Sequence, residues 1–510
     1  MAIAVAAAVS ANAQICETLT ERTTNLKEIG RLKGVCSKES RANRLGVGFE
    51  CLDRKVFDPE KVYDKIAKSG LKFARCQTGW ARTETQKGKY DFSWLDSVVD
   101  NLRSRGIQPW FNVGYGNPLY MDNLTNPTGV GHVPLYYGEE CLQAWKNYVR
   151  ALARHFKGRV DQFEIWNESN HLPFWQPEKP DAKEYAKLLK ISAGEIRREI
   201  PDAKIGAAMA GSPPAYFREL FAAGAGEILD FVSIHPYDNV PEIAYDQRVR
   251  GALSILREFG AGRVKLRQGE AGFPFRIPAG CWKKSWHPSD EDIQAKWMLR
   301  RFVIDLHNGL DMSSIFMVSD FNPNYKVGGK KQPVEAQWGL IENAPDYKPR
   351  KAVEVASRIC ALLDDKTEPA EYAFKLGPQI PENIRVSRLA DIAMNSATKC
   401  FTRNGYPMVA YYMPEDLQFK SRVIENVPAT FVWGKAAIKN PVIVDPFDGR
   451  IYAVTSKFYS GGAGALRPHR DRHPQPLQGH GGRRPCAGRE GAAGAASRHP
   501  PPGGRQVRLR

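Results

Sequence analysis

The strongest constraint on the fold is a regular alternation of strand-like and helix-like segments between about residues 44 and 365. Short apolar runs of β type alternate with amphipathic stretches of helical period. Eight strand-like runs are found, at 44–50, 73–78, 107–114, 161–168, 204–211, 230–237, 264–272 and 313–319. Strict alternation predicts a parallel sheet with helices on its faces. Eight such units in about 320 residues match the count and size of a (β/α)8 barrel.

An open, doubly wound sheet is the main alternative, because it shows a similar alternation. Dinucleotide-binding sheets of this kind carry a G-x-G-x-x-G segment after the first strand, and this sequence has none there. We therefore predict an α/β protein with a (β/α)8 TIM barrel over residues 40–365. After residue 366 strand-like segments follow one another without helices, which predicts a small β-sandwich accessory domain over 366–460.

The two ends of the chain differ from this pattern. Residues 2–9 form a short apolar run, and the following Ala11-Asn12-Ala13 is typical of a signal cleavage site. We expect a signal segment over 1–13 and a periplasmic or secreted protein, with a disordered Ala-rich terminus as the alternative. Residues 461–510 contain ten Arg, eleven Gly and seven Pro but no aromatic residue, which predicts a disordered basic tail. A reading-frame slip near Ser460 would explain why the strand pattern stops there.

Charge and cysteine content exclude several classes of protein. The net charge is +17, but the tail holds +8 of it, so the remainder gives no strong signal for nucleic acid. No apolar run approaches 18 residues, so no membrane span is expected. The nine cysteines show no CxxC or Cys/His ligand spacing. We expect neither a metal nor a cofactor, and the sequence leaves the oligomeric state open.

The chemistry of a barrel of this kind is read at the C-terminal ends of its strands. Glu168 ends the strand-like run 161–168, and Glu270 lies near the end of 264–272. Two carboxyl groups on either side of one bond are what glycoside cleavage requires, one protonated and the other ionised. We predict Glu168 as the acid and Glu270 as the anion.

Three further side chains are expected near this pair. Arg75 and the Tyr237 hydroxyl are suited to hold Glu270 as an anion, by charge and by hydrogen bonding. His235 shares a strand face with Tyr237 by the two-residue period. A structural salt bridge of Arg75 with Glu164 or Glu50, and a buried core role for His235, remain open alternatives.

These residues also resemble a known group of enzymes. Glu164-Ile-Trp-Asn-Glu168 is similar to the strand-4 signature of the clan GH-A retaining glycoside hydrolases, with family 39 nearest and families 5 and 51 less similar. The resemblance implies that Glu168 is the acid/base and that Asn167 binds the sugar 2-hydroxyl. It also implies that Glu270 in Gln268-Gly-Glu270 is the nucleophile, supported by Tyr237 in His235-Pro-Tyr237. Arg75 matches an arginine that the clan places beside the nucleophile.

The sequence departs from the clan pattern in two places. Ser169 follows Glu168 where a proline is frequent, and the strand at 313–319 lacks the tryptophan that often forms a sugar platform. Trp338 in the following loop is a candidate replacement. Tyr115, Asn117 and Trp175 are candidates for lining subsites.

The predicted function is therefore that of an O-glycosidase acting by retention on an oligosaccharide, a polysaccharide or a small glycoside. A carbohydrate-binding barrel without turnover is the alternative. A metal-dependent barrel hydrolase is disfavoured, because the strand ends offer His235 but no His-x-His and no trio of acidic residues.

Overall fold

The computed structural model describes residues 2–8, 14–18, 26–277, 290–324, 326–327, 330–331, 335–372, 374–378, 398–414, 429–433, 438–454 and 459–461. The chain divides into two units, 1–464 and 465–510, and all of the described residues lie in the first. The tail predicted at 461–510 therefore lies outside the described residues from position 462 onward. Its disorder and the proposed frame slip stay predictions.

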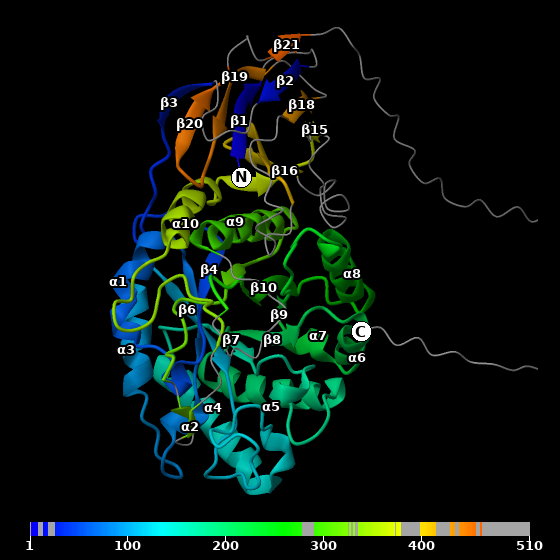
Figure 1. Ribbon diagram of the computed structural model, residues 1–510. Helices are drawn as coiled ribbons and strands as arrows, with labels where there is room; N and C mark the ends of the chain where they lie inside the picture. Colours follow the sequence, from blue (N-terminus) through cyan, green and yellow to red (C-terminus); the bar gives the residue numbers. More distant parts are fainter. Residues whose placement is uncertain are drawn as a thin grey trace, which may run out of the picture. The chain divides into compact units, whose positions relative to one another are not determined.

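Eight parallel strands close into a barrel in the order β10-β11-β4-β5-β6-β7-β8-β9 (Figure 1). Each predicted strand-like run contains one of them, and the predicted fold class is confirmed. The strands are β4 (Leu45–Phe49), β5 (Phe73–Gln77), β6 (Gln108–Val113), β7 (Gln162–Ile165), β8 (Lys204–Ala210), β9 (Phe231–His235), β10 (Lys265–Ala271) and β11 (Ser313–Ile315).

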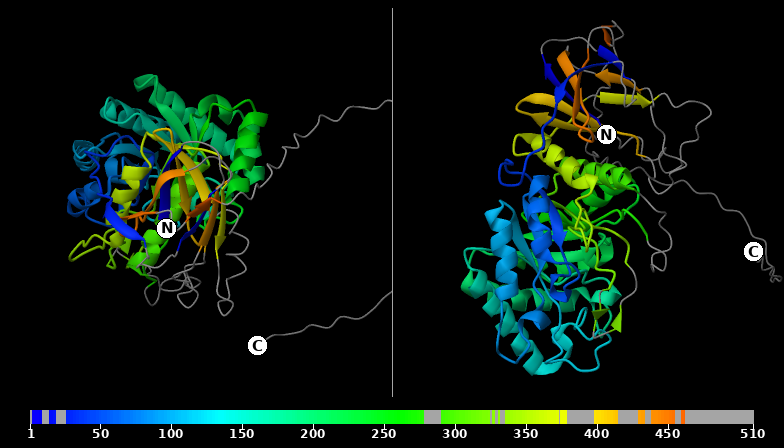
Figure 2. Two further views of the ribbon diagram at one scale, coloured as in Figure 1. Left: turned by 90° about the horizontal axis from the view of Figure 1, so that it is seen from above. Right: turned by 60° about the vertical axis from the view of Figure 1, so that its left-hand side comes forward.

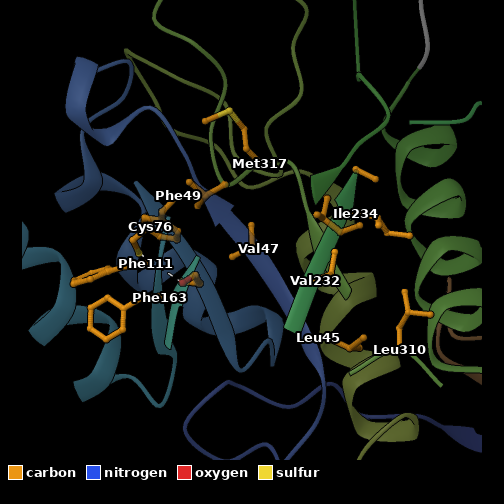
Figure 3. Packing of buried hydrophobic residues seen from close by; sticks show 14 of the residues in the cluster. Leu45, Val47, Phe49, Cys76, Phe111, Phe163, Val232, Ile234, Leu310 and Met317 are labelled. Carbon is orange, nitrogen blue, oxygen red and sulfur yellow. Dashed lines mark hydrogen bonds between the residues drawn. The ribbon is translucent and has the colours of Figure 1, made fainter. Parts of the chain in front are cut away.

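The barrel is held together by apolar side chains from strands and helices. Leu45, Val47 and Phe49 of β4 are fully buried and lie in one cluster with Val232 and Ile234 of β9 (Figure 3). On helix α3 (Ser93–Ser104) the buried residues recur at helical spacing, which turns one face toward the strands. They are Leu95, Val98, Val99 and Leu102. The burial of apolar side chains supplies most of the favourable free energy of such a fold.

The long helices lie close to the positions that the helical pattern of the sequence predicts, at 139–157, 181–199, 244–259, 290–308 and 349–363. They are α4 (Gly138–Phe156), α5 (Ala182–Glu199), α8 (Tyr245–Glu258), α9 (Glu291–His307) and α10 (Lys351–Leu362). Shorter helices are α2 (Trp80–Thr83), α6 (Pro214–Ala222) and α7 (Ala225–Ile228). Asp181 and Asp290 cap α5 and α9 by accepting hydrogen bonds from backbone N–H groups of the first turn.

The sequence pattern predicts a single helix over 58–69, opened by Asp58 and closed by Gly70, and this prediction is wrong. The segment is split into η2 (Pro59–Lys61), α1 (Tyr63–Ile66) and η3 (Ala67–Ser69). Backbone hydrogen bonds from Lys61 to Asp58 and from Val62 to Pro59 span three residues, so the chain winds as a tight 3-10 turn before α1. Val62, Tyr63 and Ile66 are still buried, so the apolar pattern is kept although the helix is interrupted.

Among the described residues, antiparallel strands form a two-stranded sheet of β12 (Lys326–Val327) and β13 (Lys330–Lys331) and two larger sheets, of seven strands (β14-β16-β17-β1-β19-β20-β3) and four strands (β15-β18-β2-β21). The strands of the two larger sheets are β1 (Ala2–Ala8), β2 (Gln14–Thr18), β3 (Lys27–Arg31), β14 (Thr367–Pro369), β15 (Phe374–Pro378), β16 (Thr398–Arg403), β17 (Tyr406–Tyr411), β18 (Ala429–Trp433), β19 (Ile438–Val444), β20 (Arg450–Ala453) and β21 (Tyr459–Gly461). The sequence predicts strands here at 372–377, 384–390, 406–412, 429–433, 440–445 and 450–454, and of these 384–390 lies wholly outside the described residues.

Both ends of the first unit contribute to these sheets. Strand β1 lies between β17 and β19, and Ala2 pairs with Tyr411 across more than four hundred residues. Figure 2 shows blue strands from the start of the chain among the yellow and orange strands of its later part. The expected signal segment covers the same residues as β1, and export stays a prediction. No helix in the described part of the chain is long and apolar enough to cross a membrane.

Candidate active site

The backbone turns sharply where β7 ends, and this turn carries Glu168. Trp166 and Glu168 have φ values of 66° and 44°, in the left-handed region that non-glycine residues rarely adopt. Hydrogen bonds from neighbouring strands hold the turn: Trp166 N–H donates to the Val113 carbonyl at 2.9 Å, and Asn112 Nδ2 donates to the Trp166 carbonyl at 2.7 Å. A strained turn of this kind persists only where its surroundings fix it.

Glu270 lies on β10, and each of its two carboxylate oxygens accepts a hydrogen bond from a strong donor. Arg75 Nη1 donates to Oε2 at 2.7 Å, and the Tyr237 hydroxyl donates to Oε1 at 2.8 Å. Bonds of this kind favour the ionised carboxylate. The predicted partners of Glu270 are therefore both in contact with it.

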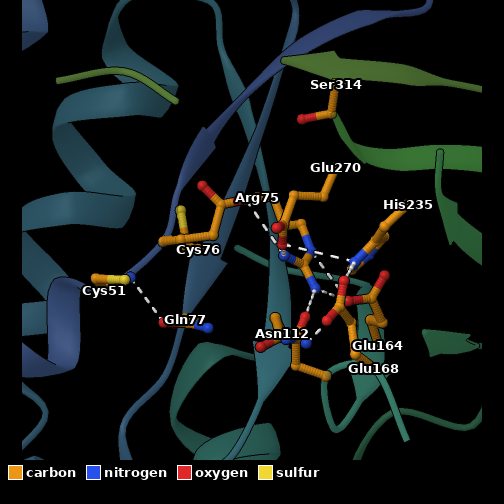
Figure 4. A network of polar contacts seen from close by, with 12 residues as sticks. Cys51, Arg75, Cys76, Gln77, Asn112, Glu164, Glu168, His235, Glu270 and Ser314 are labelled. Atoms are coloured by element: carbon orange, nitrogen blue, oxygen red, sulfur yellow. Dashed lines mark hydrogen bonds and ion pairs between the residues drawn. The ribbon is translucent and has the colours of Figure 1, made fainter. Parts of the chain in front are cut away.

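Arg75 is fully buried and links four side chains, of which Figure 4 labels Glu164 and Glu270. Besides Glu270 it donates to Glu164 Oε1 from Nε at 3.0 Å, to Asn167 Oδ1 at 2.8 Å and to Glu50 Oε1 at 3.2 Å. Burial by itself would lower the pKa of Arg75, but the surrounding carboxylates raise it well above its usual value. The sequence left open a structural salt bridge of Arg75 with Glu164 or Glu50 as the alternative to a site role. Arg75 forms both of these salt bridges and also contacts Glu270.

Glu168 is bonded to a buried histidine. His235 Nδ1 lies 2.9 Å from Glu168 Oε1 and 3.7 Å from Glu270 Oε2. Burial lowers the pKa of His235 to about 4, so the imidazole is neutral near pH 7. Its Nε2 is buried and has no hydrogen-bond partner in the described part of the chain, which favours the proton on Nδ1, facing the carboxyl groups.

The two predicted catalytic carboxyl groups have different environments. Burial raises the pKa of Glu168, although His171 and Arg75 partly oppose this. Glu270 instead accepts hydrogen bonds from a guanidinium and a phenol. One potential ligand atom from each of Glu168, His235 and Glu270 lies within 4.8 Å of the other two. One nitrogen and two carboxylate oxygens at this spacing are also compatible with a cation, but the Arg75 guanidinium already neutralises one of the carboxylates.

The aromatic rings of Trp338 and Phe316 pack next to Tyr237. The Trp338 ring meets Tyr237 edge to face at a centroid distance of 5.8 Å and meets Phe316 at the same distance. Gln294 Nε2 donates to the Trp338 carbonyl at 3.2 Å, and Asp320 accepts from the Gly339 N–H at 2.8 Å, so this loop is held on both sides. Trp338 is only 5% exposed. Its role as a sugar platform stays a prediction, and its contacts support Tyr237.

Three candidate subsite residues are buried within the loops. Tyr115, Asn117 and Trp175 are exposed by at most 2%. Asn117 donates to the Glu84 carbonyl, and Trp175 donates to the Tyr136 hydroxyl. These contacts fix the loops around the site.

Sequence reasoning did not assign a site role to Glu50 or Asn112. Glu50 directly follows β4 and contacts Arg75, while Asn112 of β6 donates to Glu164 and to the turn before Glu168. Burial raises the pKa of Glu50 to about 8. The strand-end rule that identified Glu168 would also have pointed to Glu50, because Glu50 is the last residue of the predicted run 44–50.

Comparison with known proteins agrees with this geometry. The model of "Glycosyl hydrolases family 39" matches residues 60–257. Residues 60–257 of this chain are therefore similar to the family 39 glycosyl hydrolases. The predicted resemblance to clan GH-A, nearest to family 39, is confirmed.

The individual proteins that are similar to this chain have low sequence identity with it. A beta-xylosidase of Geobacillus stearothermophilus is 24% identical over 202 residues, 35% of this chain and 38% of its own length. Beta-galactosidase BbgII of Bifidobacterium bifidum is 27% identical over 134 residues, 22% of this chain and 19% of its own length. The chain thus matches less than two fifths of either relative. A family 39 glycoside hydrolase of Bacteroides cellulosilyticus WH2 shares the fold, with a TM-score of 0.52, 15% identity, and coverage of 84% of this chain and 96% of that one.

Proposed function

We propose that the protein hydrolyses O-glycosidic bonds with retention, with Glu168 as acid/base and Glu270 as nucleophile. The observation that carries this proposal is a close pair of carboxyl groups in opposite environments. Their oxygens approach within 4.8 Å. Retaining enzymes have about 5–5.5 Å between the two carboxyl groups, whereas inverting enzymes have about 6.5–9.5 Å.

In the first step a Glu270 oxygen attacks the anomeric carbon while the bond to the leaving oxygen breaks. Glu168 gives its proton to that oxygen. The raised pKa of Glu168 supports this role, because the group keeps its proton at a pH where an exposed glutamate has lost it. The contacts with Arg75 and Tyr237 keep Glu270 ionised and fix the direction of its oxygens.

In the second step water attacks the anomeric carbon, and the Glu168 carboxylate takes one proton from it. The ester bond to Glu270 breaks and restores the carboxylate. Asn167 is oriented by Arg75, which binds its Oδ1, so the Nδ2 end is the part available to a sugar hydroxyl. This agrees with the 2-hydroxyl contact that the clan resemblance implies.

The first substrates to test are β-xylosides, because one relative of the barrel is named a beta-xylosidase. β-Galactosides come next, because the other relative is named a beta-galactosidase. Aryl glycosides of both sugars, with β-glucosides and α-L-arabinofuranosides, make up the panel. Proton NMR of the first anomer released distinguishes retention from inversion.

Variants of the two glutamates test their roles. E270A should lower kcat/KM by at least ~10⁴-fold. E168Q should lower it by roughly 10²–10⁴-fold on substrates with poor leaving groups. E168Q should recover on dinitrophenyl glycosides, whose leaving group needs no proton.

The matched control is E242Q, because Glu242 is also buried and bonded to an arginine but lies outside the site. Substantial activity of E270A, or no recovery of E168Q on dinitrophenyl glycosides, would contradict the proposed roles. Sugar binding by calorimetry without any turnover would instead favour the carbohydrate-binding barrel.

We also propose that the protein is exported, on the strength of the apolar run at 2–9 and the small residues that follow it. Cleavage before Gln14 would remove β1 from between β17 and β19. N-terminal sequencing of protein from a secreting host tests this directly. An intact residue 2 in the mature protein would refute cleavage.

A further inference from the structure

Glu50 is a buried carboxyl group that the proposed reaction does not use. It is 1% exposed, so a sugar in the site does not reach it. Its Oε1 accepts a hydrogen bond from Arg75 Nη1 at 3.2 Å, and the same nitrogen donates to Glu270 at 2.7 Å. Glu50 and Glu270 therefore share one nitrogen of one guanidinium.

The space that Glu50 occupies is provided by a glycine two residues earlier. A Cβ atom at Gly48 would lie 1.7 Å from Glu50 Oε2 and 2.3 Å from Cδ. Residues 48 and 50 point to the same side of a strand, so only the missing side chain at 48 lets the carboxyl group fold back toward Arg75. Gly48 of β4 thus leaves free the space in which the Glu50 carboxyl group lies.

The second oxygen of Glu50 favours the protonated acid. Glu50 Oε2 is buried and has no hydrogen-bond partner within the described residues. An ionised oxygen in that state would be costly, whereas a neutral acid is tolerated at lower cost. Burial raises the pKa of Glu50 to about 8, and the negative charge of Glu270 contributes in the same direction.

The charges around Glu50 lead to the same assignment. The titratable groups that interact with it are the guanidinium of Arg75, the carboxyl group of Glu270, the buried thiols of Cys51 and Cys76, and the phenol of Tyr237. Glu164 shares Arg75 with it. Arg75 is the positive charge in this set, and it contacts three carboxyl groups. Three ionised carboxylates on one guanidinium would leave two negative charges uncompensated in a buried space.

We propose that Glu50 is a positioning residue for Glu270: as a neutral acid it accepts a hydrogen bond from the Arg75 Nη1 that also binds the nucleophile, without competing for the positive charge. This inference rests on the proposed function of Glu270. Ionisation of Glu50 places a second anion on the same nitrogen and weakens the hold of Arg75 on Glu270. The proposal therefore predicts a pH dependence that belongs to Glu50 and not to the acid/base.

The experiment separates Glu50 from Glu168 by using E168Q as the parent enzyme and a dinitrophenyl glycoside as substrate. Glycosylation then needs no acid, so kcat/KM no longer reports the ionisation of Glu168. We expect kcat/KM of E168Q to fall above about pH 8, where Glu50 ionises. The double variant E168Q/E50Q should show no such fall, and E168Q/E242Q should keep it.

Single variants in the wild-type enzyme test positioning at pH 6. E50A should lower kcat/KM by roughly 10-fold or more with little change in KM, because Arg75 loses a hydrogen-bond partner. E50Q should restore most of that loss, since a carboxamide can replace a neutral acid. G48A should resemble E50A, whereas G48A/E50A should be no worse than E50A alone, because the added methyl group then meets no carboxyl group.

Three results would overturn the proposal. They are a persistent alkaline fall in E168Q/E50Q, a folded E50Q as impaired as E50A, and an E50Q that does not fold. Labelling with [δ-13C]glutamate gives a readout without substrate: one resonance should titrate near pH 8 and be missing in E50Q. If the wild type cleaves no glycoside but this resonance is present, the proposed function fails while the protonation of Glu50 stands.

Discussion

Replacing Arg75 by methionine is the most informative single perturbation of the site. Methionine keeps an unbranched apolar side chain next to Trp110, over whose ring the guanidinium lies at 5.8 Å. The substitution removes five hydrogen bonds, which join Arg75 to Glu50, Glu164, Asn167 and Glu270. It leaves the buried carboxylate of Glu164 and the partly buried carboxylate of Glu270 without their cation.

The expected cost follows from that loss of charge compensation. Removing one partner of a buried ion pair typically destabilises a protein by about 3–5 kcal/mol, because the other charge stays buried. In domains of 150–250 residues each kcal/mol changes Tm by roughly 2–4 °C, and larger units lie at the lower end. We therefore expect R75M to melt roughly 6–10 °C below the wild type at pH 7.

The deficit should shrink as the pH is lowered. A buried carboxylate that has lost its cation takes up a proton more readily, and protonation removes the uncompensated charge. Scanning fluorimetry at a fixed heating rate from pH 7 to pH 4.5 measures this directly. The heating rate is kept the same for all variants, because the apparent Tm of a chain that unfolds irreversibly depends on that rate.

R300M is the matched control. Arg300 is also buried and donates to Glu242 at 2.7 Å, outside the site. It should lower Tm by a similar amount but leave turnover of a cleaved aryl glycoside largely intact, whereas R75M should lose it. An R75M variant that melts within about 1 °C of the wild type at pH 7 would refute the charge argument.

Three further predictions concern neighbouring residues. Y237F removes a hydrogen bond to an ionised carboxylate, so kcat/KM should fall by roughly 10–100-fold with little change in Tm; an unchanged rate would exclude Tyr237 from support of the nucleophile. Burial lowers the pKa of His235 and of His307 to about 4, so each contributes stability that is present above its unfolded pKa of about 6.5 and is lost as the pH falls toward 4. Tm should therefore drop over that window, less steeply in H307Q, and identical slopes would contradict this. G269A places a Cβ 1.7 Å from Ser233 Oγ and should lower Tm, with partial recovery in G269A/S233A; a wild-type Tm for G269A would show that the strands move apart easily.

The strand-end residues could be predicted because a parallel barrel imposes their convergence. Once eight strands are recognised, Glu168 and Glu270 must lie at the same rim, and the two-residue period of a strand places His235 and Tyr237 on one face. The contacts of His235 with Glu168 and of Tyr237 with Glu270 follow from that geometry. Local sequence was enough to predict these contacts, because each barrel strand pairs with the strands that come before and after it along the chain and the last pairs with the first.

The pairing of β1 could not be read from local sequence. Ala2–Ala8 is a run of small apolar residues that suits a signal segment as well as a strand. Its neighbours β17 and β19 lie more than four hundred residues away along the chain. The state of such a segment depends on partners that its own residues do not specify. The same holds for Asn117 and Trp175, whose position in a loop did not reveal that other loops cover them.

His235 connects the two halves of the proposed reaction. At rest its Nδ1 lies 2.9 Å from Glu168 and 3.7 Å from the ionised Glu270. When Glu270 becomes an ester and Glu168 gives up its proton, the negative charge moves from one carboxyl group to the other, over less than 4.8 Å. A neutral imidazole with its proton on Nδ1 can donate to whichever group is ionised. The site keeps one negative charge throughout, because Glu168 becomes ionised as Glu270 becomes an ester. That is the condition under which a buried site can exchange the roles of two glutamates without rearranging the strands that carry them.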